Sequence, residues 1–296
     1  YNDAASVSYG KYSLTFGTTP LTTTVNYTYS INAQFIHLNK AGTHLFVGRS
    51  ASSGTTFVRY TIATNTLTPI TLTGTNATYL IDFDTYVDGS NVEHLCVGAG
   101  LKIACTADDG DNWTYTTTLP GSSTYRIDRL GVRLKADNSV NFVVNKGLIS
   151  NAAISAFYHS EDGGTTWDQG GRSFNATMNP TAAASAGTPR VYSINDDPFE
   201  EGVWYMSDDW RTYRSDDDGD HFLEKDHGAQ NTVNTDVAVA PNGRWFQTAM
   251  DAGIQYSDDK GVTWIQGTPS IAKGQPFVSN NPNDYGGHYW RVITLG

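Results

Sequence analysis

The chain has 296 residues, of which 39% are hydrophobic and 12% aromatic, so it is too rich in apolar side chains for a disordered polypeptide. Its 30 acidic residues outnumber its 19 basic residues, and the net charge of −11 argues against nucleic acid or anionic membrane as a partner. No apolar run approaches the roughly 18–20 residues needed to cross a bilayer, and 29 glycines among many Thr, Ser and Asn residues are typical of short strands joined by turns.

The N-terminal half begins with a predicted two-stranded hairpin and continues with four-stranded units. The hairpin is KYSLTFGTTPLTTTVN at 11–26, and it resembles the last two strands of the next unit, which spans 34–72. Further units are predicted at 79–117 and 125–169. Each unit is a run of short strands that alternate with turn residues.

The C-terminal half repeats the same plan and then stops after two strands. One unit covers 190–225, and the clearest unit covers 235–268. Its strands A to D are predicted at 236–240, 244–249, 253–257 and 263–267. The last segment, 275–296, supplies an A strand and a B strand only.

An eight-residue acidic motif occupies the predicted turn between strands C and D in four of the units. The copies are TADDGDNW, SEDGGTTW, SDDDGDHF and SDDKGVTW, which begin at residues 106, 160, 215 and 257 and are therefore 54, 55 and 42 residues apart. A catalytic site is seldom built four times in one chain, whereas a structural turn often is. Periods of this length with short strands indicate propeller blades.

The residue types of the motif fit a tight hairpin turn. Glycine at position five can adopt positive φ, the aspartate at position three can accept backbone N–H groups, and the aromatic residue at position eight can bury a large apolar surface. We therefore expect structural roles for Asp108, Asp162, Asp217 and Asp259, and for Trp113, Trp167, Phe222 and Trp264. A calcium loop of the EF-hand type is not expected, because the Glu that closes such a loop is missing.

These four segments resemble the Asp box, or BNR repeat, of sialidase-like β-propellers. SEDGGTTW and SDDKGVTW match the pattern Ser-x-Asp-x-Gly-x-Thr-Trp at every defined position, TADDGDNW departs at positions one and seven, and SDDDGDHF departs at positions seven and eight. The resemblance implies that the boxes lie on outer C–D turns, away from the active site. The Arg-Ile-Pro motif and a clear Tyr–Glu nucleophile pair of sialidases are absent, which argues against a true sialidase. Related single-domain propellers include other glycosidases, polysaccharide lyases and lectins.

The predicted fold is all-β, a single six-bladed β-propeller over residues 1–296. Five blades are complete, and the sixth combines the N-terminal hairpin with the two C-terminal strands, which leaves no open sheet edge. Seven blades are the alternative, because the long connection at 168–189 has room for degenerate strands.

Candidate ligand-binding residues come from the starts of the A strands, which point toward the axis of a propeller. Aligning these starts gives a first ring of Gln34, Tyr79, Tyr125, Arg190, Asp236 and Gln275, and a second ring of His37, Asp82, Asp128, Ser193, Val239 and Ser279. A polar funnel of this kind is suited to a sugar. The structural alternative is a set of polar groups satisfied by water.

The chemistry of these residues suggests roles at a carbohydrate site. Asp82, Asp128 and Asp236 are candidate general acids or bases, because crowded carboxylates have separated pKa values. His37 could act as the base of a lyase, and Tyr125 could donate a phenolic proton. The remaining candidates for sugar binding are Gln34 and Gln275, Tyr79 by stacking, and Arg126, Arg129 and Arg190 by bidentate bonds to a carboxylate.

Three features predict a secreted glycoprotein. Asn-x-Ser/Thr sequons occur at Asn26, Asn76, Asn112 and Asn175, and the chain opens at Tyr1 without Met, as expected for a processed mature form. Cys96 and Cys105 lie on either side of a predicted hairpin turn and could form a disulfide, two buried thiols being the alternative.

The sequence thus predicts a monomeric extracellular protein that acts on an oligo- or polysaccharide. A glycosidase or polysaccharide lyase is the leading function, with no cofactor and no metal ligands expected. The alternatives are a lectin without catalysis and a protein-binding scaffold.

Overall fold

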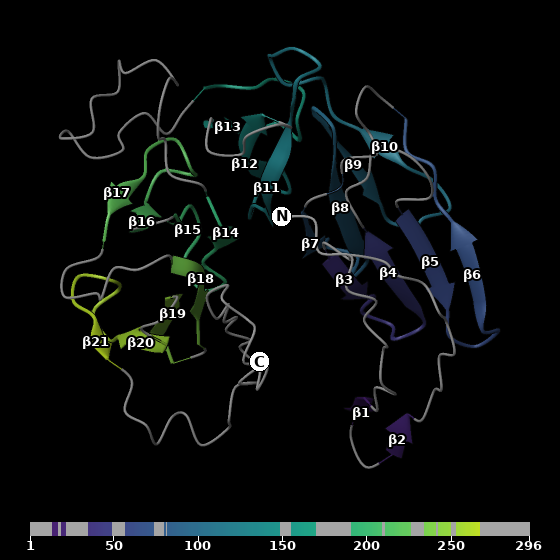
Figure 1. Ribbon diagram of the computed structural model, residues 1–296, viewed down its shortest axis with the longest axis horizontal. Coiled ribbons are helices and arrows are strands. Elements are labelled where there is room, and N and C mark those ends of the chain that lie inside the picture. The colour runs from purple at the N-terminus through teal and green to yellow at the C-terminus, as the bar shows by residue number, and fades with distance from the viewer. Residues whose placement is uncertain are drawn as a thin grey trace, which may run out of the picture.

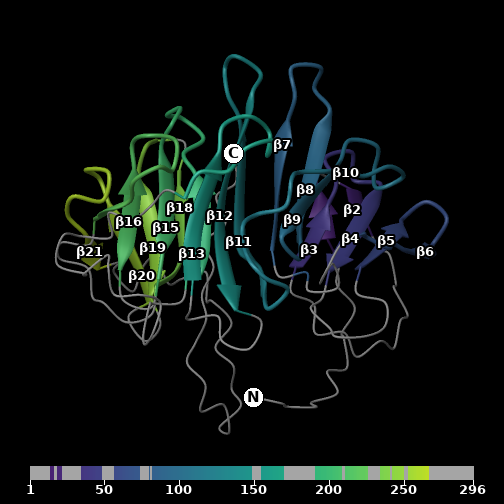
Figure 2. The same ribbon diagram turned by 90° about the horizontal axis from the view of Figure 1, so that it is seen from above.

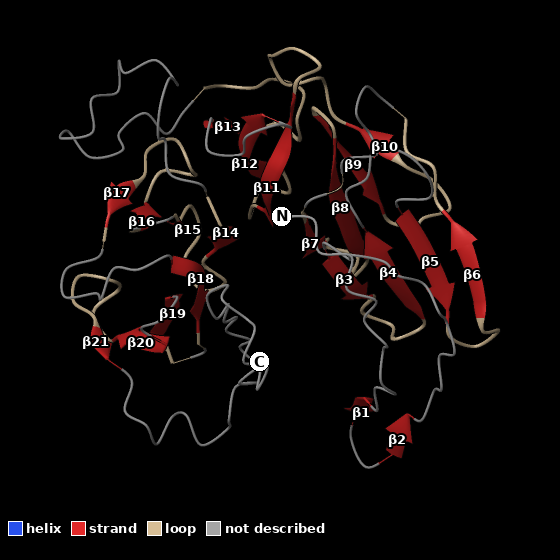
Figure 3. Ribbon diagram, viewed as in Figure 1, coloured by secondary structure: helices blue, strands red, loops and turns tan. Residues whose placement is uncertain are grey.

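The computed structural model of the chain (Figure 1) describes residues 14–16, 19–21, 35–48, 57–73, 80, 82–148, 155–169, 191–208, 211–225, 234–240, 242–249 and 253–266. Within these ranges the structure consists of strands and turns, with no helix (Figure 3), so nothing in the described part of the chain forms an apolar helix of membrane-spanning length. Every strand pairing is antiparallel. The prediction of an all-β chain is confirmed.

Five sheets follow one another along the chain, and in each sheet neighbouring strands are also consecutive in sequence. The first sheet contains β3 (Phe35–Leu38), β4 (His44–Gly48), β5 (Phe57–Thr61) and β6 (Thr66–Pro69). The second contains β7 (Phe83–Val87), β8 (Glu93–Ala99), β9 (Lys102–Thr106) and β10 (Thr114–Tyr115). The third contains β11 (Tyr125–Leu134), β12 (Val140–Leu148) and β13 (Ser155–Ser160).

The last two of the five sheets lie in the C-terminal half. The fourth contains β14 (Ser193–Asp196), β15 (Trp204–Ser207), β16 (Thr212–Ser215) and β17 (Leu223–Glu224). The fifth contains β18 (Asn234–Val239), β19 (Trp245–Ala249), β20 (Gly253–Ser257) and β21 (Ile265–Gln266). These sheets match the five predicted four-strand units, except that the fourth strand of the third unit is reduced to the isolated bridge between His159 and Asp168.

The five sheets are arranged around a common centre like the blades of a propeller. The first strand of each sheet, namely β3, β7, β11, β14 and β18, is the innermost, and the last strand lies at the rim (Figure 1). The view at right angles shows the A–B turns of the second and third sheets on one side of the ring (Figure 2). Side chains of the first strands are therefore the ones that can meet near the centre.

The hydrophobic core is divided among the interfaces between neighbouring blades. Phe46 and Phe57 of the first blade pack with Leu95 and Val97 of the second, and the same kind of cluster recurs at each following interface. Trp204 and Trp245, two of the largest buried side chains, are at most 1% exposed. Because burying such a side chain contributes roughly 2–3 kcal/mol, each blade is stabilised mainly by its neighbours.

The two ends of the chain were predicted to share a blade. The N-terminal part of that prediction has a counterpart in β1 (Leu14–Phe16) and β2 (Thr19–Leu21), which form a two-stranded antiparallel sheet. Residues 275–296 lie outside the described residues. The shared blade, and with it the total of six blades, therefore stays a prediction.

Cys96 and Cys105 form the predicted disulfide. They are directly opposite one another on β8 and β9, and their Cα atoms are 4.1 Å apart. A sequence separation of 9 residues makes this a small loop across a tight hairpin.

Candidate functional site

The four acidic turns share one hydrogen-bond pattern, in which the aspartate side chain holds the turn together. In the turn at 160–167, Asp162 Oδ1 accepts the N–H groups of Thr165 and Thr166, both at 2.9 Å, and Oδ2 accepts the Thr166 hydroxyl at 2.7 Å. The Ser160 hydroxyl donates to Asp162 at 2.9 Å and accepts the Gly164 N–H at 2.8 Å.

The sister turns repeat these bonds. Hydrogen bonds from the side chains of Asn112 and Thr263 lower the pKa of Asp108 and Asp259 from the ordinary value, as expected when donors stabilise the charged form. The charged side chains of Asp108 and Asp259 therefore stabilise their turns.

The glycine of each acidic turn lies against the preceding blade. Gly164 has a φ of +81°, and an added Cβ would lie 2.3 Å from Cγ2 of Thr116. Gly219 has a φ of +91°, and its Cβ would lie 2.4 Å from Val143. The indole N–H of Trp264 donates to the Lys225 carbonyl, at 2.7 Å, across the next interface. The acidic turns thus have a structural role between adjacent blades. The remaining candidate catalytic and binding residues lie on the inner strands.

Polar side chains of the innermost strands bond to the backbone of the next innermost strand. Asp82 and Asp84 accept the N–H groups of Leu130 and Val132 on β11, at 3.1 and 2.8 Å. Similar hydrogen bonds join the third blade to the fourth and the fourth blade to the fifth. The Arg129 Nε donates to the Tyr192 carbonyl at 2.6 Å, and Asn195 Nδ2 donates to the Val237 carbonyl at 3.0 Å and to Asp236 at 3.3 Å. Three predicted site residues, Asp82, Arg129 and Asp236, therefore take part in contacts between blades.

Asp128 and Arg126 form an ion pair in the third blade, with Arg126 Nε 2.7 Å from Asp128 Oδ1. Asp128 is only 4% exposed, and its second oxygen has no hydrogen-bond partner within the described part of the chain. The β11–β12 register shifts between Ile127 and Arg129, which leaves Asp128 out of the regular ladder. The ring of Tyr125, at the start of the same strand, faces the ammonium group of Lys146, 4.9 Å from the ring centre.

His37 lies on β3 beside a carboxylate that the sequence analysis did not select. Its Nε2 is 3.3 Å from Glu93 Oε1, and its ring packs beside Phe46 and Phe83. The other oxygen of Glu93 accepts the Lys40 N–H at 2.6 Å. Burial alone would raise the pKa of Glu93, but the hydrogen bonds from His37 and Lys40 lower it overall.

Asp84 and Asp196, neither of which was predicted, are carboxyl groups with a raised pKa. Burial, followed by the nearby charge of Asp196, raises the pKa of Asp84 well above its usual range. Burial also raises the pKa of Asp196, and the Arg133 guanidinium opposes this rise. The side chain of Asp196 keeps 35% of its surface exposed. Asp196 is therefore largely surrounded by protein atoms, but its side chain remains accessible to water.

Asp84 and Asp196 belong to blades on either side of the third blade, and β11 lies between them. Asp84 Oδ2 accepts the Val132 N–H at 2.8 Å, and the next residue, Arg133, places its NH1 3.9 Å from Asp196 Oδ2. The same NH1 donates to the carbonyls of Asp197 and Glu200, at 2.7 and 2.6 Å, which fixes the guanidinium beside β14. Asp84 and Asp196 therefore contact adjacent residues of β11 from the two neighbouring blades, and the charge of Asp196 is near enough to raise the pKa of Asp84.

A sequence signal for Asp84 existed. It stands two residues after Asp82 in IDFDTY, and residues i and i+2 of a strand face the same side. Aligning only the first and fourth positions of each A strand passed over it. The predicted residues Gln34, Tyr79, Arg190 and Gln275 lie outside the described residues, as do Ser279 and the sequons at Asn26, Asn76 and Asn175. The fourth sequon, Asn112, is described, and its side chain donates to Asp108 at 2.7 Å.

Similarity to known proteins is found in the fold and not in the sequence. No protein-family model matches the sequence, and no curated protein matches it. Among solved structures, the chain is similar to a GH74 enzyme from Niastella koreensis, with a TM-score of 0.54 and 15% identity over 79% of this chain and 36% of that one. It is also similar to an ancestral GH74 enzyme, with a TM-score of 0.56 and 15% identity over 80% of this chain and 31% of that one.

A third similar structure is the β-propeller domain of Cps50 (Swd1) from Myceliophteria thermophila. The TM-score is 0.53 at 10% identity, over 82% of this chain and 74% of that domain. The chain spans only about a third of the length of the two GH74 enzymes. Together with the ring of antiparallel sheets, these likenesses show that the fold is a β-propeller.

Proposed function

We propose that this propeller hydrolyses a glycan near its centre, with Asp84 as the general acid and Asp196 as the second carboxylate. The observation that carries the proposal is that these two carboxylates contact adjacent residues of β11, Val132 and Arg133, and that the charge of Asp196 helps to raise the pKa of Asp84. Glycoside hydrolysis generally uses two carboxyl groups, of which one is protonated and the other ionised. A pair whose surroundings differ is suited to this division of roles.

The different surroundings of Asp84 and Asp196 determine which of the two is the general acid. Asp84 is surrounded by protein and feels the charge of Asp196, and both effects favour its protonated form. A carboxyl group that holds its proton near neutral pH can give it to the glycosidic oxygen. Asp196 has the guanidinium of Arg133 3.9 Å away, which favours its ionised form over that of Asp84. Asp196 then acts as the nucleophile or as the base for water.

Other features support the proposal without deciding it. Two of the similar solved structures are GH74 enzymes, glycoside hydrolases built on the same fold. The acidic turns resemble the Asp box of sialidase-like propellers, so we propose membership of that family. We also propose that Tyr125, Arg126 and Asp128 contribute to sugar binding beside the catalytic pair, together with Gln34, Tyr79, Arg190 and Gln275.

The proposal includes the architecture predicted from the sequence. We infer a single domain of six blades, closed by pairing the N-terminal hairpin with strands from residues 275–296, since closure removes exposed sheet edges. The disulfide and the four sequons favour a secreted, N-glycosylated protein that acts as a monomer.

A glycan-binding or protein-binding propeller without catalysis is the second candidate. One observation favours it: Asp82, Arg129 and Asp236 each form a hydrogen bond with a neighbouring blade, as structural residues do. A lyase is a third possibility, for which His37 paired with Glu93 is the candidate base.

The first test is incubation with a panel of plant, fungal and animal polysaccharides, with products read by mass spectrometry and ultraviolet absorbance. We expect products that have gained one water, and we expect Asp84→Asn and Asp196→Asn each to lower the rate by at least about 100-fold. Asp258→Asn is the matched control, because Asp258 is 55% exposed and pairs with Arg244 in a surface ion pair.

Other outcomes of the panel reject the hydrolase. Unsaturated ends that absorb ultraviolet light would identify a lyase and direct attention to His37. Retention on a glycan with no cleavage would leave the binding function.

A further inference from the structure

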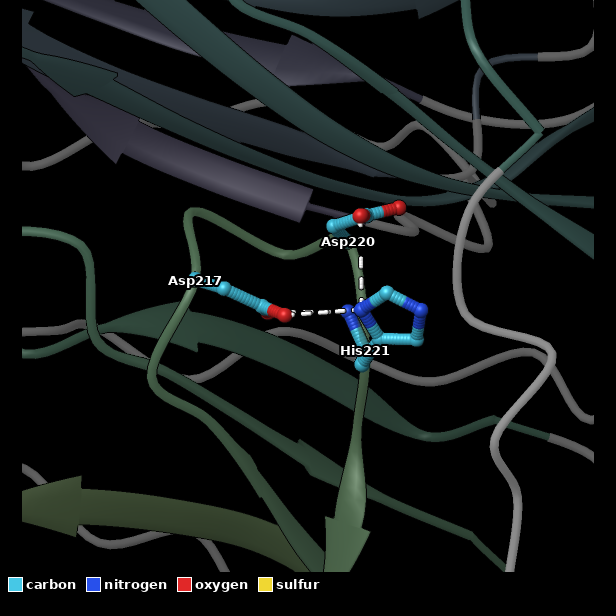
Figure 4. Close-up of side chains that lie close together, drawn as sticks. All are labelled: Asp217, Asp220 and His221. Carbon is cyan, nitrogen blue, oxygen red and sulfur yellow. Dashed lines mark hydrogen bonds and ion pairs between the residues drawn. The ribbon is translucent and has the colours of Figure 1, made fainter.

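The acidic turn at 215–222 carries different side chains from the other three acidic turns, at 106–113, 160–167 and 257–264. Its sixth and seventh positions are Asp220 and His221, whereas the sister turns have Asp111 and Asn112, Thr165 and Thr166, or Val262 and Thr263. The His221 Nδ1 lies 2.8 Å from Asp217 Oδ2 and 3.3 Å from Asp220 Oδ2 (Figure 4). One ligand atom from each of these three side chains lies within 4.8 Å of the other two.

A second histidine, His159 of the neighbouring blade, lies beside Asp220. His159, on β13, is 7% exposed, and its Nδ1 has no hydrogen-bond partner within the described residues. The nearest carboxylate oxygen in an ion-pair contact with it is Asp220 Oδ1, at 3.9 Å. A buried ring nitrogen with no hydrogen bond is costly, and this nitrogen lies beside the carboxylate of Asp220, where it can act as a ligand atom.

Backbone contacts hold the acidic turn against the strand pair that carries His159. His159 is paired in register with Val143 on β12, and Gly219 of the acidic turn packs directly against Val143. Asn141, also on β12, donates to the Asp218 carbonyl at 3.0 Å. The turn is thus held firmly against the third blade, and Asp220 is placed between His221 and His159.

We propose that Asp217, Asp220 and His221 bind a divalent transition-metal ion of the zinc class, and that His159 completes the site from the preceding blade. Imidazole nitrogen and carboxylate oxygen are ligands of such ions, at about 2.0–2.2 Å. Ligand atoms in a tetrahedral site of this size stand about 3.4 Å apart. The 3.3 Å between His221 and Asp220 already fits, and the pair at 2.8 Å needs to open by about half an ångström once the bridging proton leaves.

Metal binding at this site would join the third and fourth blades. His221 and Asp220 are about half exposed, with side-chain exposures of 51% and 44%, so an ion can enter and these side chains can adjust. His159 is fixed by burial and supplies a ligand from the other side of the interface. An ion that binds only the folded ring stabilises it.

The test measures zinc binding by calorimetry and thermal unfolding on tag-free protein, with two variants taken from the sister turns. His221→Thr keeps the turn, since Thr166 and Thr263 make the equivalent side-chain bond to their aspartates. Asp220→Thr copies Thr165. We expect one zinc ion per wild-type chain, a raised melting temperature with zinc, and a loss of at least about 10-fold in affinity in each variant.

His159→Gln and His44→Gln separate the site from general effects. His44 lies 3.4 Å from Asp109 on another acidic turn, and among the described residues no third metal-ligating side chain joins this pair. Its replacement should therefore leave zinc affinity unchanged, while His159→Gln should weaken it about 10-fold. Equal zinc affinity in the wild type and His221→Thr would overturn the proposal. So would an absence of binding by the wild type at millimolar zinc, and unchanged affinity in His159→Gln would remove that residue from the site.

Discussion

At the scale of single residues, the acidic turns show why the same residue type recurs at each copy of a motif. Gly163 and Gly164 both have positive φ, +69° and +81°, but an added Cβ meets nothing within 4 Å at Gly163 and lies 2.3 Å from Thr116 at Gly164. The first position favours glycine only through its backbone conformation, and Asp109, Asp218 and Lys260 occupy the equivalent place in the other turns with φ of +57° to +58°. The second needs glycine also for contact with the preceding blade.

Alanine at these two positions should separate the two causes. We expect Gly163→Ala to lower the free energy of unfolding by about 1–2 kcal/mol, the cost of a left-handed residue, and Gly164→Ala to lower it by a further 1–3 kcal/mol or so because of overpacking. Urea unfolding of the two variants and the wild type measures both. Equal losses would mean that the blade interface yields to the extra methyl group.

At the scale of strands and hairpins, most of the pattern was predictable. The unit at 235–268 was predicted with strands at 236–240, 244–249, 253–257 and 263–267, and the structure has β18 to β21 in these places. Local alternation and turn residues carry this information. The exception is the third blade, where the expected fourth strand is only the His159–Asp168 bridge.

The hairpin of β8 and β9 carries a stability prediction. The disulfide between Cys96 and Cys105 closes a loop with a sequence separation of 9, and such a loop contributes roughly 2–3 kcal/mol by restricting the unfolded chain. Reduction should therefore lower the free energy of unfolding by this amount in a denaturant titration. The control is the double variant Cys96→Ala/Cys105→Ala, whose unfolding should not respond to reductant, and a reduced wild type as stable as the oxidised one would contradict the expectation.

At the scale of the whole molecule, contacts between blades determine which side chains lie near one another. The sequence alone does not predict these contacts. Asp84 bonds to Val132, 48 residues away, and its pKa depends on Asp196, more than a hundred residues away. No local pattern encodes such partners. Strand periodicity predicts a polar ring on the innermost strands, but it does not predict which carboxylates influence one another.

The raised pKa of Asp84 also links the proposed function to stability. The folded pKa of Asp84 lies above the unfolded value, so its contribution to folding is fully present below the unfolded pKa and is lost as pH rises through the folded pKa. An ionised Asp84 is therefore unfavourable for the fold. A protein that keeps such a group gains an acid that can donate a proton.

The most direct test of the account is a carboxyl ¹³C NMR titration of protein labelled at aspartate. Besides the raised pKa of Asp196, we predict one aspartate, Asp84, that titrates well above the usual value of about 3.9. Its signal should be absent in Asp84→Asn, and its pKa should fall in Asp196→Asn because the neighbouring charge is gone. If every aspartate titrates at or below about 4, the centre of this propeller holds no poised acid, and the proposed hydrolase loses its catalytic pair.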